Sequence, residues 1–293
     1  MGKRSLSIWG LGAIGLVILF AFQNCANPNA NFDLRAKMGT AGQSDDIFGQ
    51  GDPVDNGNPT NIVCDPFATT DKTSPGLKAA LYIYEGKNPE KEIDNLSDIF
   101  SKGKKIEDTA VYFSRLYVPT RAWTSGFENQ GGQKLENSKG ETLIEWFGLR
   151  FETLIKLNDN DDEGYYQLAT ISDDGSVVEV DKDGKGFKRI VDNDGETSTR
   201  MRCGGYVYLR KGDRLPARIA YFQGPRVEIA LNLLWRKVEP GTTPSSQHCN
   251  TNDNFFSGGK DGKKMSDLKK HGWKVMETTN FELKEKVAVD CSK

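Results

Sequence analysis

Residues 149–180, LRFETLIKLNDNDDEGYYQLATISDDGSVVEV, carry the pattern that decides the fold class. Leu149–Leu157 places apolar side chains at every second position, which is the period of a strand with one buried face. An acidic stretch interrupts it, a second run follows at Tyr165–Ile171, and Asp-Asp-Gly separates that run from Val177–Val180. Short runs divided by Asp- and Gly-rich turns predict antiparallel strands.

The same pattern recurs on both sides of this stretch. Upstream, Leu81–Tyr84 and Val111–Leu116 are predicted as strands, and downstream shorter runs lead to Val227–Trp235, where apolar residues alternate strictly. One helix is expected after the first run, with Asn88 as its cap and Pro89 as its first residue. The sequence therefore predicts an all-β chain, an antiparallel β-sandwich with one short helix and a small C-terminal extension.

Residues 76–237 resemble the PA14 family, the β-sandwich module first known from the anthrax protective antigen. The resemblance rests on the order of four motifs: an apolar strand at Trp146–Leu157, Gly-Tyr at 164–165, Asp-Asp-Gly at 173–175, and the alternating strand that ends in Trp235. The resemblance covers over half of the chain. It implies a PA14-like sandwich over 76–240 and a binding module rather than a catalyst.

The resemblance also implies a role for Asp173 and Asp174. In related adhesins this pair resembles a calcium clamp joined by a cis peptide, in which both carboxylates bind the ion and the ion binds vicinal sugar hydroxyls. Calcium takes about six to eight oxygen ligands, which suits adjacent carboxylates. A later loop supplies further ligands in the adhesins. Here that loop contains Gln223, has no Asn or Asp, and carries the positive charge of Arg226.

Two alternatives stay open at these candidate ligand-binding residues. Asp-Asp-Gly also forms plain hairpin turns, because Asp side chains accept bonds from nearby backbone N–H groups and Gly accepts positive φ. Trp123 lies in a Gly-rich, turn-like stretch where it could stack on a sugar ring, whereas a Trp in a sandwich most often belongs to the core.

Other chemistry-bearing motifs are scarce. Three acidic segments, at 159–164, 181–186 and 192–196, are expected to be solvated hairpin tips, and the first imitates an EF-hand loop without its final Glu. The chain has only two histidines and no nucleophile elbow, phosphate loop or dinucleotide fingerprint. We therefore expect that the protein is not an enzyme.

Residues 1–24 have the plan of a secretory signal peptide. A short positive region, Lys3 and Arg4, precedes an uncharged apolar run over 8–22, which is short for an untilted span of about 20 residues. Cys25 follows in the order Phe-Gln-Asn-Cys, which resembles the lipobox variant of Bdellovibrio-like envelope lipoproteins. We expect an exported lipoprotein, acylated at Cys25 and held at the cell outer membrane. An uncleaved N-terminal anchor is the alternative.

Residues 25–75 are rich in Asn, Asp, Gly, Pro and Thr, and their few apolar residues follow no period. Such a segment buries too little surface to offset its ordering entropy. We therefore expect a flexible tether that lifts the folded domain off the membrane.

Cysteine usage suggests an oxidising compartment. With Cys25 assigned to lipid, an even number remains, which suggests two disulfides among Cys64, Cys203, Cys249 and Cys291. Four cysteines allow three pairings, and the sequence alone does not choose among them. Because Cys249 and Cys291 bracket the C-terminal extension at 241–293, we expect them to pair and to leave Cys64 with Cys203. A zinc site is the competing reading, and the absence of C-x-x-C spacing disfavours it.

The balance of charged residues limits the classes of binding partner. Lys plus Arg total 39 and Asp plus Glu total 41, a near balance that gives no field for nucleic acid or for an anionic membrane surface. Two function classes remain. The first is an adhesion-type lipoprotein that binds carbohydrate, with calcium as its expected cofactor and a glycan as its partner. The second is a structural or protein-interaction lipoprotein that binds an envelope or surface protein and no sugar.

Overall fold

The computed structural model describes residues 47–48, 59–65, 76–128, 134–137, 139–239, 249, 251, 263–285 and 289. They all fall within the unit Asp45–Lys293. The expected signal peptide, Cys25 and Cys291 lie outside the described residues. No helix in the described part of the chain is long and apolar enough to cross a membrane.

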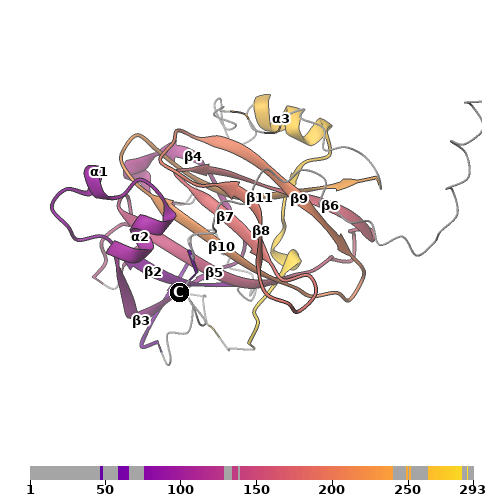
Figure 1. Cartoon of the computed structure of the whole chain (residues 1–293), viewed down its shortest axis with the longest axis horizontal. Coiled ribbons are helices and arrows are strands. Elements are labelled where there is room, and N and C mark those ends of the chain that lie inside the picture. The colour runs from indigo at the N-terminus through magenta and orange to yellow at the C-terminus, as the bar shows by residue number, and fades with distance from the viewer. Residues whose placement is uncertain are drawn as a thin grey trace, which may run out of the picture. The chain divides into compact units, whose positions relative to one another are not determined.

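Eight strands form the larger sheet, in the order β1-β3-β2-β5-β10-β7-β8, with β13 paired to β5 (Figure 1). All of these pairs are antiparallel except β1 with β3. The central strand β5 carries the alternating run of the sequence, with Leu149, Phe151 and Ile155 buried in the core. The strands are β1 Asn61–Cys64, β2 Leu77–Ile83, β3 Lys104–Phe113, β5 Phe147–Ile155, β7 Ser176–Val180, β8 Lys188–Asn193, β10 Leu215–Gln223 and β13 Phe281–Glu282.

Five strands form the smaller sheet, in the order β12-β11-β6-β9, with β4 paired to β11. The alternating residues of β11 that face the core include Ile229, Leu231 and Trp235. Val227, which the sequence places at the start of this alternation, precedes the strand and is 73% exposed. The strands are β4 Tyr117–Ala122, β6 Gly164–Asp173, β9 Arg200–Leu209, β11 Glu228–Val238 and β12 Lys274–Val275.

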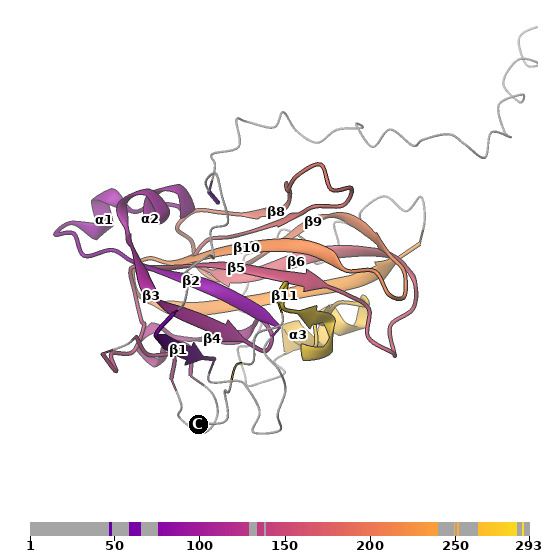
Figure 2. The ribbon, with the colours of Figure 1, turned by 90° about the horizontal axis from the view of Figure 1, so that it is seen from below.

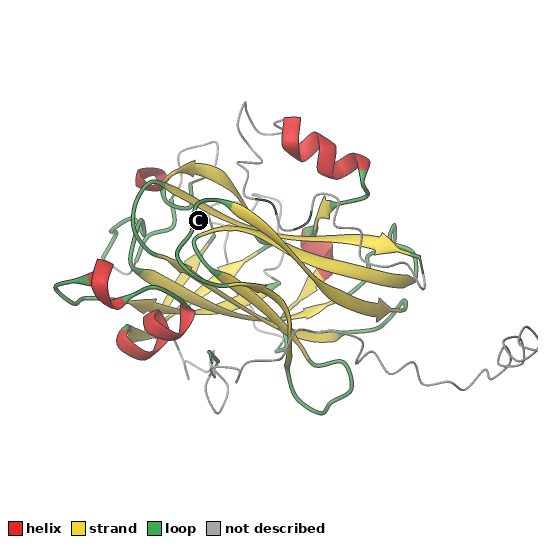
Figure 3. Ribbon diagram, turned by 45° about the horizontal axis from the view of Figure 1, so that its top comes forward, coloured by secondary structure: helices red, strands yellow, loops and turns green. Residues whose placement is uncertain are grey.

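The core lies between the two sheets, which Figures 2 and 3 show as stacked layers. Its centre is a cluster of rings in mostly edge-to-face contact, with Phe113 and Phe151 5.1 Å apart between centroids and Phe127 and Phe147 5.9 Å apart. Aromatic pairs prefer such geometry. The structure confirms the predicted β-sandwich, because successive residues of the central strands alternate between the core and a cluster on the outer face of their sheet.

The single helix predicted after Asn88 is two short helices. Asn88 makes no side-chain cap, whereas Asn95 accepts a bond from the backbone N–H of Asp98 at 3.0 Å and starts a second helix. This second helix packs Ile99 and Phe100 on the outer face of the larger sheet. A third helix lies in the C-terminal extension. The bounds are α1 Pro89–Glu92, α2 Leu96–Lys102 and α3 Lys263–Lys270.

The stretch expected to be a tether contacts the sandwich at two places. Ile47 and Phe48 are 2% and 3% exposed, and they join the cluster of Tyr82, Phe100 and Phe222 on the outer face of the larger sheet. Further along, β1 pairs with β3 at the sheet edge. The expectation of a plain spacer fails at these residues, because they are apolar and the face beside α2 removes them from water.

The C-terminal extension belongs to both sheets. Strand β12 pairs with β11 of the smaller sheet, and β13 pairs with β5 of the larger one. Leu268 and Trp273 cover the outer face of the smaller sheet, whereas Met276 and Phe281 reach the central core. The extension therefore completes the sandwich at this end.

The expected disulfide pairing is wrong. Cys203 bonds to Cys249, with 5.3 Å between the Cα atoms, so neither the pair Cys249 with Cys291 nor the pair Cys64 with Cys203 exists. The reason is that the segment after β11 returns along β9, where the backbone N–H of Met201 donates to Thr251 O at 2.8 Å. Cys64 is disulfide-bonded as well.

Candidate ligand site at the Asp173–Asp174 junction

The Asp-Asp-Gly triplet joins the two sheets. Asp173 ends β6 in the smaller sheet, and Ser176 begins β7 in the larger one. The plain hairpin is therefore not what this triplet forms, since a hairpin would link neighbours in one sheet. The peptide bond between Asp173 and Asp174 is cis, the arrangement that the PA14 resemblance implies.

Glycine is required at the third position of the triplet. A Cβ on Gly175 would lie 2.4 Å from the Phe222 ring and 2.9 Å from both Asp194 Oδ1 and the Gly195 backbone nitrogen. Such contacts are closer than non-bonded atoms allow. The missing side chain lets the junction pack directly against the end of β10 and the loop after β8.

Two loops hold the two carboxylates in place. Asp174 accepts a backbone N–H bond from Thr197 at its Oδ1 and another from Gly224 at its Oδ2, both at 2.8 Å. The hydroxyl of Thr199 lies 3.1 Å from Asp173 Oδ2, within hydrogen-bond distance. The acid pair, meaning Asp173 and Asp174, is thus fixed by the β8–β9 and β10–β11 loops.

The positive charge near the acid pair does not compensate for its burial. Asp173 and Asp174 are only 4% and 2% exposed. Burial, with help from the charge of Asp174, raises the pKa of Asp173 to about 8. Burial also raises the pKa of Asp174 to about 7, although the N–H bonds from Thr197 and Gly224 act in the opposite direction. A cation placed between the carboxylates would stabilise their ionised forms.

Further acids surround the pair. Glu228 Oε2 lies 3.1 Å from the same Thr199 hydroxyl that contacts Asp173. One cation, Arg200, acts on Asp174 and lowers its pKa, although burial outweighs this effect. Arg200 donates to Asn193 Oδ1 at 2.7 Å and to Asp194 O at 2.6 Å.

A chain of buried polar side chains supports the junction from behind. Asn193 Nδ2 donates to Ser172 Oγ at 2.9 Å, Ser172 and Ser176 share a bond of 2.8 Å, and Ser176 donates to Thr170 Oγ1 at 2.9 Å. Ser172 and Ser176 flank the triplet on either side. Each of these hydroxyls has a hydrogen-bond partner. This row of hydrogen bonds therefore fixes the junction without leaving the hydroxyls unpaired in the interior.

The loop that holds Asp174 is also tied to helix α2. Asp194 Oδ1 accepts the backbone N–H of Leu96 at 2.9 Å, at the start of that helix. The backbone N–H of Glu196 donates to Asp94 O at 2.9 Å. Sequence reasoning treats 192–196 as a solvated hairpin tip, whereas Asp194 is a helix cap that anchors one wall of the site.

Gln223 is placed inside the protein. It is fully buried, its Oε1 accepts the Tyr221 hydroxyl at 2.6 Å, and its Nε2 donates to Glu228 O at 3.1 Å. The Tyr221 hydroxyl lies 2.8 Å from Asp173 O as well. Gln223 therefore shapes the β10–β11 loop and presents no side-chain atom to a ligand.

Trp123 is half-buried beside the same loop. Its backbone N–H donates to Val227 O at 3.1 Å, and the Arg226 guanidinium lies over its ring at 4.8 Å from the centroid. Arg226 also pairs with Glu145 at 3.3 Å. The positive charge that the sequence places near the acid pair is thus engaged by Trp123 and Glu145, and one ring face of Trp123 is covered.

The two carboxylates suit a hard cation whose other coordination positions are filled by groups from outside the acid pair. Among the residues described, no group of three or more His, Cys, Asp or Glu side chains gathers in metal-binding geometry. Two carboxylates are the contribution of this chain at the junction. Calcium needs about six to eight oxygens, so water, carbonyl or ligand hydroxyl oxygens would have to complete the shell.

The acidic stretch at 159–164 is not a plain solvated tip. Asp161 is 3% exposed, and it accepts bonds from Lys274 Nζ at 2.7 Å, Asn280 Nδ2 at 2.7 Å and the backbone N–H of Asn158 at 3.0 Å. Burial alone would raise the pKa of Asp161, yet these bonds outweigh it and hold the pKa below its usual range. Asp161 fastens the β5–β6 loop to the C-terminal extension.

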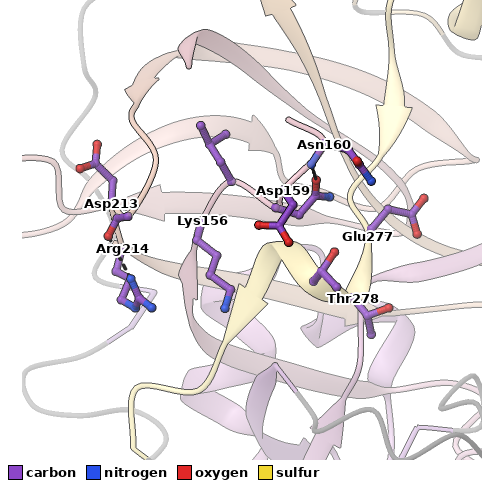
Figure 4. A pocket seen from close by; sticks show the side chains of 11 residues that line it. Lys156, Asp159, Asn160, Asp213, Arg214, Glu277 and Thr278 are labelled. Atoms are coloured by element: carbon purple, nitrogen blue, oxygen red, sulfur yellow. Dashed lines mark hydrogen bonds between the residues drawn. The ribbon is translucent and has the colours of Figure 1, made fainter. Parts of the chain in front are cut away.

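A polar pocket of about 610 Å³ lies next to this loop (Figure 4). Its lining comes from the loop that follows β5, the turn before β10 and residues 277–279 of the extension. Strands β6 and β10 both run from this pocket to the acid pair, so the two features lie at opposite ends of the sandwich.

Comparisons with known proteins find only distant structural similarity. No protein-family model and no curated protein matches the sequence. Among solved structures, the PA14 sugar-binding domain from an RTX adhesin is 16% identical with a TM-score of 0.40, over 60% of this chain and 98% of that domain. The PA14 domain of the MpAFP antifreeze protein is 12% identical with a TM-score of 0.40, over 61% and 92%. The epithelial adhesin 6 A domain from Candida glabrata, in complex with Galβ1-3GlcNAc, is 14% identical with a TM-score of 0.38, over 61% and 86%. At these values function has to be argued from the site.

Proposed function

We propose that this protein is a carbohydrate-binding, adhesion-type module in which Asp173 and Asp174 hold a calcium ion. The ion supplies a hard Lewis acid to which vicinal sugar hydroxyls add as oxygen ligands. The chain's own residues fix the two carboxylates, and the walls around them come from the β8–β9 and β10–β11 loops. In this proposal Gln223 and Trp123 act through those loops, and neither is a direct ligand.

One observation carries the proposal: two adjacent carboxylates are buried, held by backbone N–H donors and short of positive charge. Burying such a pair without a cation is costly, because like charges in a poorly solvated site oppose ionisation. A structural role alone would be served by a neutral pair of side chains at lower cost. The arrangement is therefore best explained by a cation that the ligand helps to hold.

Export and lipidation at Cys25 belong to the same proposal, with the outer membrane of a bacterial envelope as the location. They are supported by the charged-then-apolar start of the sequence and by the cysteine that follows it. The described disulfide between Cys203 and Cys249 suits an oxidising compartment. Mass spectrometry of the mature protein tests this part, since an unmodified Cys25 thiol contradicts it.

A glycan array, run with calcium and then with chelator, tests the sugar-binding function. We expect binding that chelator abolishes and that Asp173→Asn and Asp174→Asn remove. Asp183→Asn serves as the matched control, because Asp183 lies in another loop and is exposed. A silent array together with a specific crosslinked envelope protein supports the structural or protein-interaction class instead.

A further inference from the structure

The polar pocket at the far end of the sandwich is assembled from three separate parts of the chain. Lys156 and Asn158–Asn160 follow β5, Gly212–Arg214 precede β10, and Glu277–Thr279 belong to the extension. Strand β6, which has ten residues, separates this end from the acid pair by about 30 Å at the usual rise of a strand. Any ligand in this pocket is therefore independent of the acid pair.

The walls of the pocket are fixed before any ligand arrives. Lys211 Nζ donates to Asn158 O at 2.6 Å and to Asp159 O at 2.9 Å, and thereby joins two of the loops. Lys156 and Asn280 exchange bonds, from Lys156 N to Asn280 O at 3.0 Å and from Asn280 Nδ2 to Lys156 O at 3.1 Å. These bonds hold the β5 end against the extension. Such preorganisation lowers the entropic cost of binding.

The cations of the pocket are already paired. Lys156 Nζ and Arg214 Nε contact the two oxygens of Glu282 at 2.9 and 3.0 Å, and Glu277 pairs with Arg115 at 2.8 Å. The Lys156 and Arg214 charges also hold the pKa of Glu282 below its usual range. An anionic ligand would have to break these pairs to reach the cations. Charge therefore disfavours an anion.

Other polar groups of the pocket remain open to a ligand. Within the described part of the chain, the side chains of Asp159, Asn160, Thr278 and Thr279 form no hydrogen bond and no ion pair. In the view of Figure 4, Asp159 lies between Lys156 and Thr278. A carboxylate, an amide and hydroxyls, with Leu157 as the sole apolar lining residue, complement a hydroxyl-rich molecule. The volume of about 610 Å³ falls within the range of small-molecule sites.

We propose that this pocket is a second, cation-independent site for a small neutral saccharide, with Asp159 as its principal hydroxyl acceptor. The inference goes beyond the proposed function, because it needs neither the acid pair nor calcium. The pocket offers hydrogen bonds and no aromatic face among its lining residues, so we expect weak binding, at millimolar concentration.

Protein-detected NMR of the full chain tests this site, with glucose and lactose as probes in excess chelator. We expect the amides of Asn158–Asn160 and Gly212 to shift on titration. Asp159→Ala should weaken binding roughly tenfold, as expected for a lost charge-assisted hydrogen bond. Thr278→Val is the second variant, and it should weaken binding less.

Two controls separate this site from the acid pair. Asp183→Ala, at an exposed loop, and Asp174→Asn should both leave the pocket shifts unchanged. The proposal is overturned if neither sugar shifts the pocket amides, or if the shifts disappear with chelator or in Asp174→Asn. If the pocket shifts persist while calcium does not bind, the proposed function fails and this site stands.

Discussion

At the scale of single residues, the acid pair should make the calcium-free protein less stable as pH rises. The pKa values of about 8 for Asp173 and about 7 for Asp174 lie above the 3.8 of an unperturbed aspartate, so the folded state keeps protons that the unfolded chain releases. Their contribution is complete below pH 4 and is lost as pH rises through 7 to 8. The loss should amount to a few kcal/mol, since each pKa unit corresponds to about 1.4 kcal/mol.

Urea unfolding in chelator, at several pH values, measures this effect. Asp173→Asn should flatten the decline relative to the wild type, because a neutral amide replaces the group that must lose its proton. Asp183→Asn should follow the wild type. If the unfolding free energy falls equally with pH in the wild type and in Asp173→Asn, the pKa of Asp173 is not raised by folding.

Gly175→Ala should destabilise the protein by about 1–3 kcal/mol, the usual cost of overpacking a tight interior. The added Cβ would meet the Phe222 ring and the backbone of Gly195. Thermal unfolding measures the change. Gly205→Ala is the control, since its Cβ would meet only the flexible Ile190 side chain, at 3.3 Å. A Gly175→Ala protein as stable as that control would contradict the packing described for the junction.

Some of these residues could be predicted from the sequence and others could not. Asp173, Asp174 and Gly175 stand out because they are contiguous and carry a distinctive chemistry. The burial of Gln223 cannot be predicted from the sequence, since the conformation of the β10–β11 loop determines its partners, the Tyr221 hydroxyl and Glu228 O. Asp161 likewise looks like its exposed neighbours, because its partner Lys274 is far along the chain.

At the scale of elements, the segment that holds Ile47 and Phe48 should detach without unfolding the sandwich. Phe48→Ala removes a buried ring from the outer face of the larger sheet. Truncating a core Phe costs about 3–5 kcal/mol of unfolding free energy. Here the segment can detach locally while the sandwich stays folded, so we expect a smaller loss of global stability.

Limited proteolysis together with thermal unfolding distinguishes local detachment of this segment from unfolding of the whole sandwich. We expect Phe48→Ala to be cut before β1 much faster than the wild type, while its melting temperature changes little. Ile62→Ala, at a side chain that is 46% exposed, should behave as the wild type does in this region. A melting temperature lowered as far as for a truncated core residue would mean that this segment is part of the cooperative core.

Most strands could be predicted because their apolar residues alternate, as in β5 and β11. Strand β4 cannot be predicted from the sequence, since Pro119 and Arg121 interrupt its apolar pattern; its pairing with β11 defines it. The break between α1 and α2 cannot be predicted either, because the apolar residues keep a helical spacing across it. The disulfide pairing depends on which strand the C-terminal extension lies against. Local sequence patterns do not encode this position.

At the scale of the whole molecule, Asp161 ties the extension to the loop between the two sheets. Asp161→Asn should destabilise the protein by about 1–3 kcal/mol, because it removes the charge that Lys274 contacts and places an amide against the Asn280 donor. The pKa of Asp161 is depressed, so its contribution is present above the unfolded-state pKa and is lost as pH falls.

Chemical unfolding at pH 7 and at pH 3 measures this contribution. The gap between the wild type and Asp161→Asn should narrow at the lower pH. Asp162→Asn is the control, because Asp162 pairs with Lys237 at 3.1 Å while its side chain is 81% exposed, and such pairs contribute little. A constant gap at both pH values would assign the effect to shape rather than to charge.

In the proposed function, two neighbouring carboxylates at the sheet junction share one calcium ion. Titration calorimetry of the full chain with calcium at pH 8 measures this binding, with Asp174→Asn studied in parallel. We expect saturable binding of one ion to the wild type and none to the variant. Absence of binding to the wild type, or equal binding to both proteins, would contradict it.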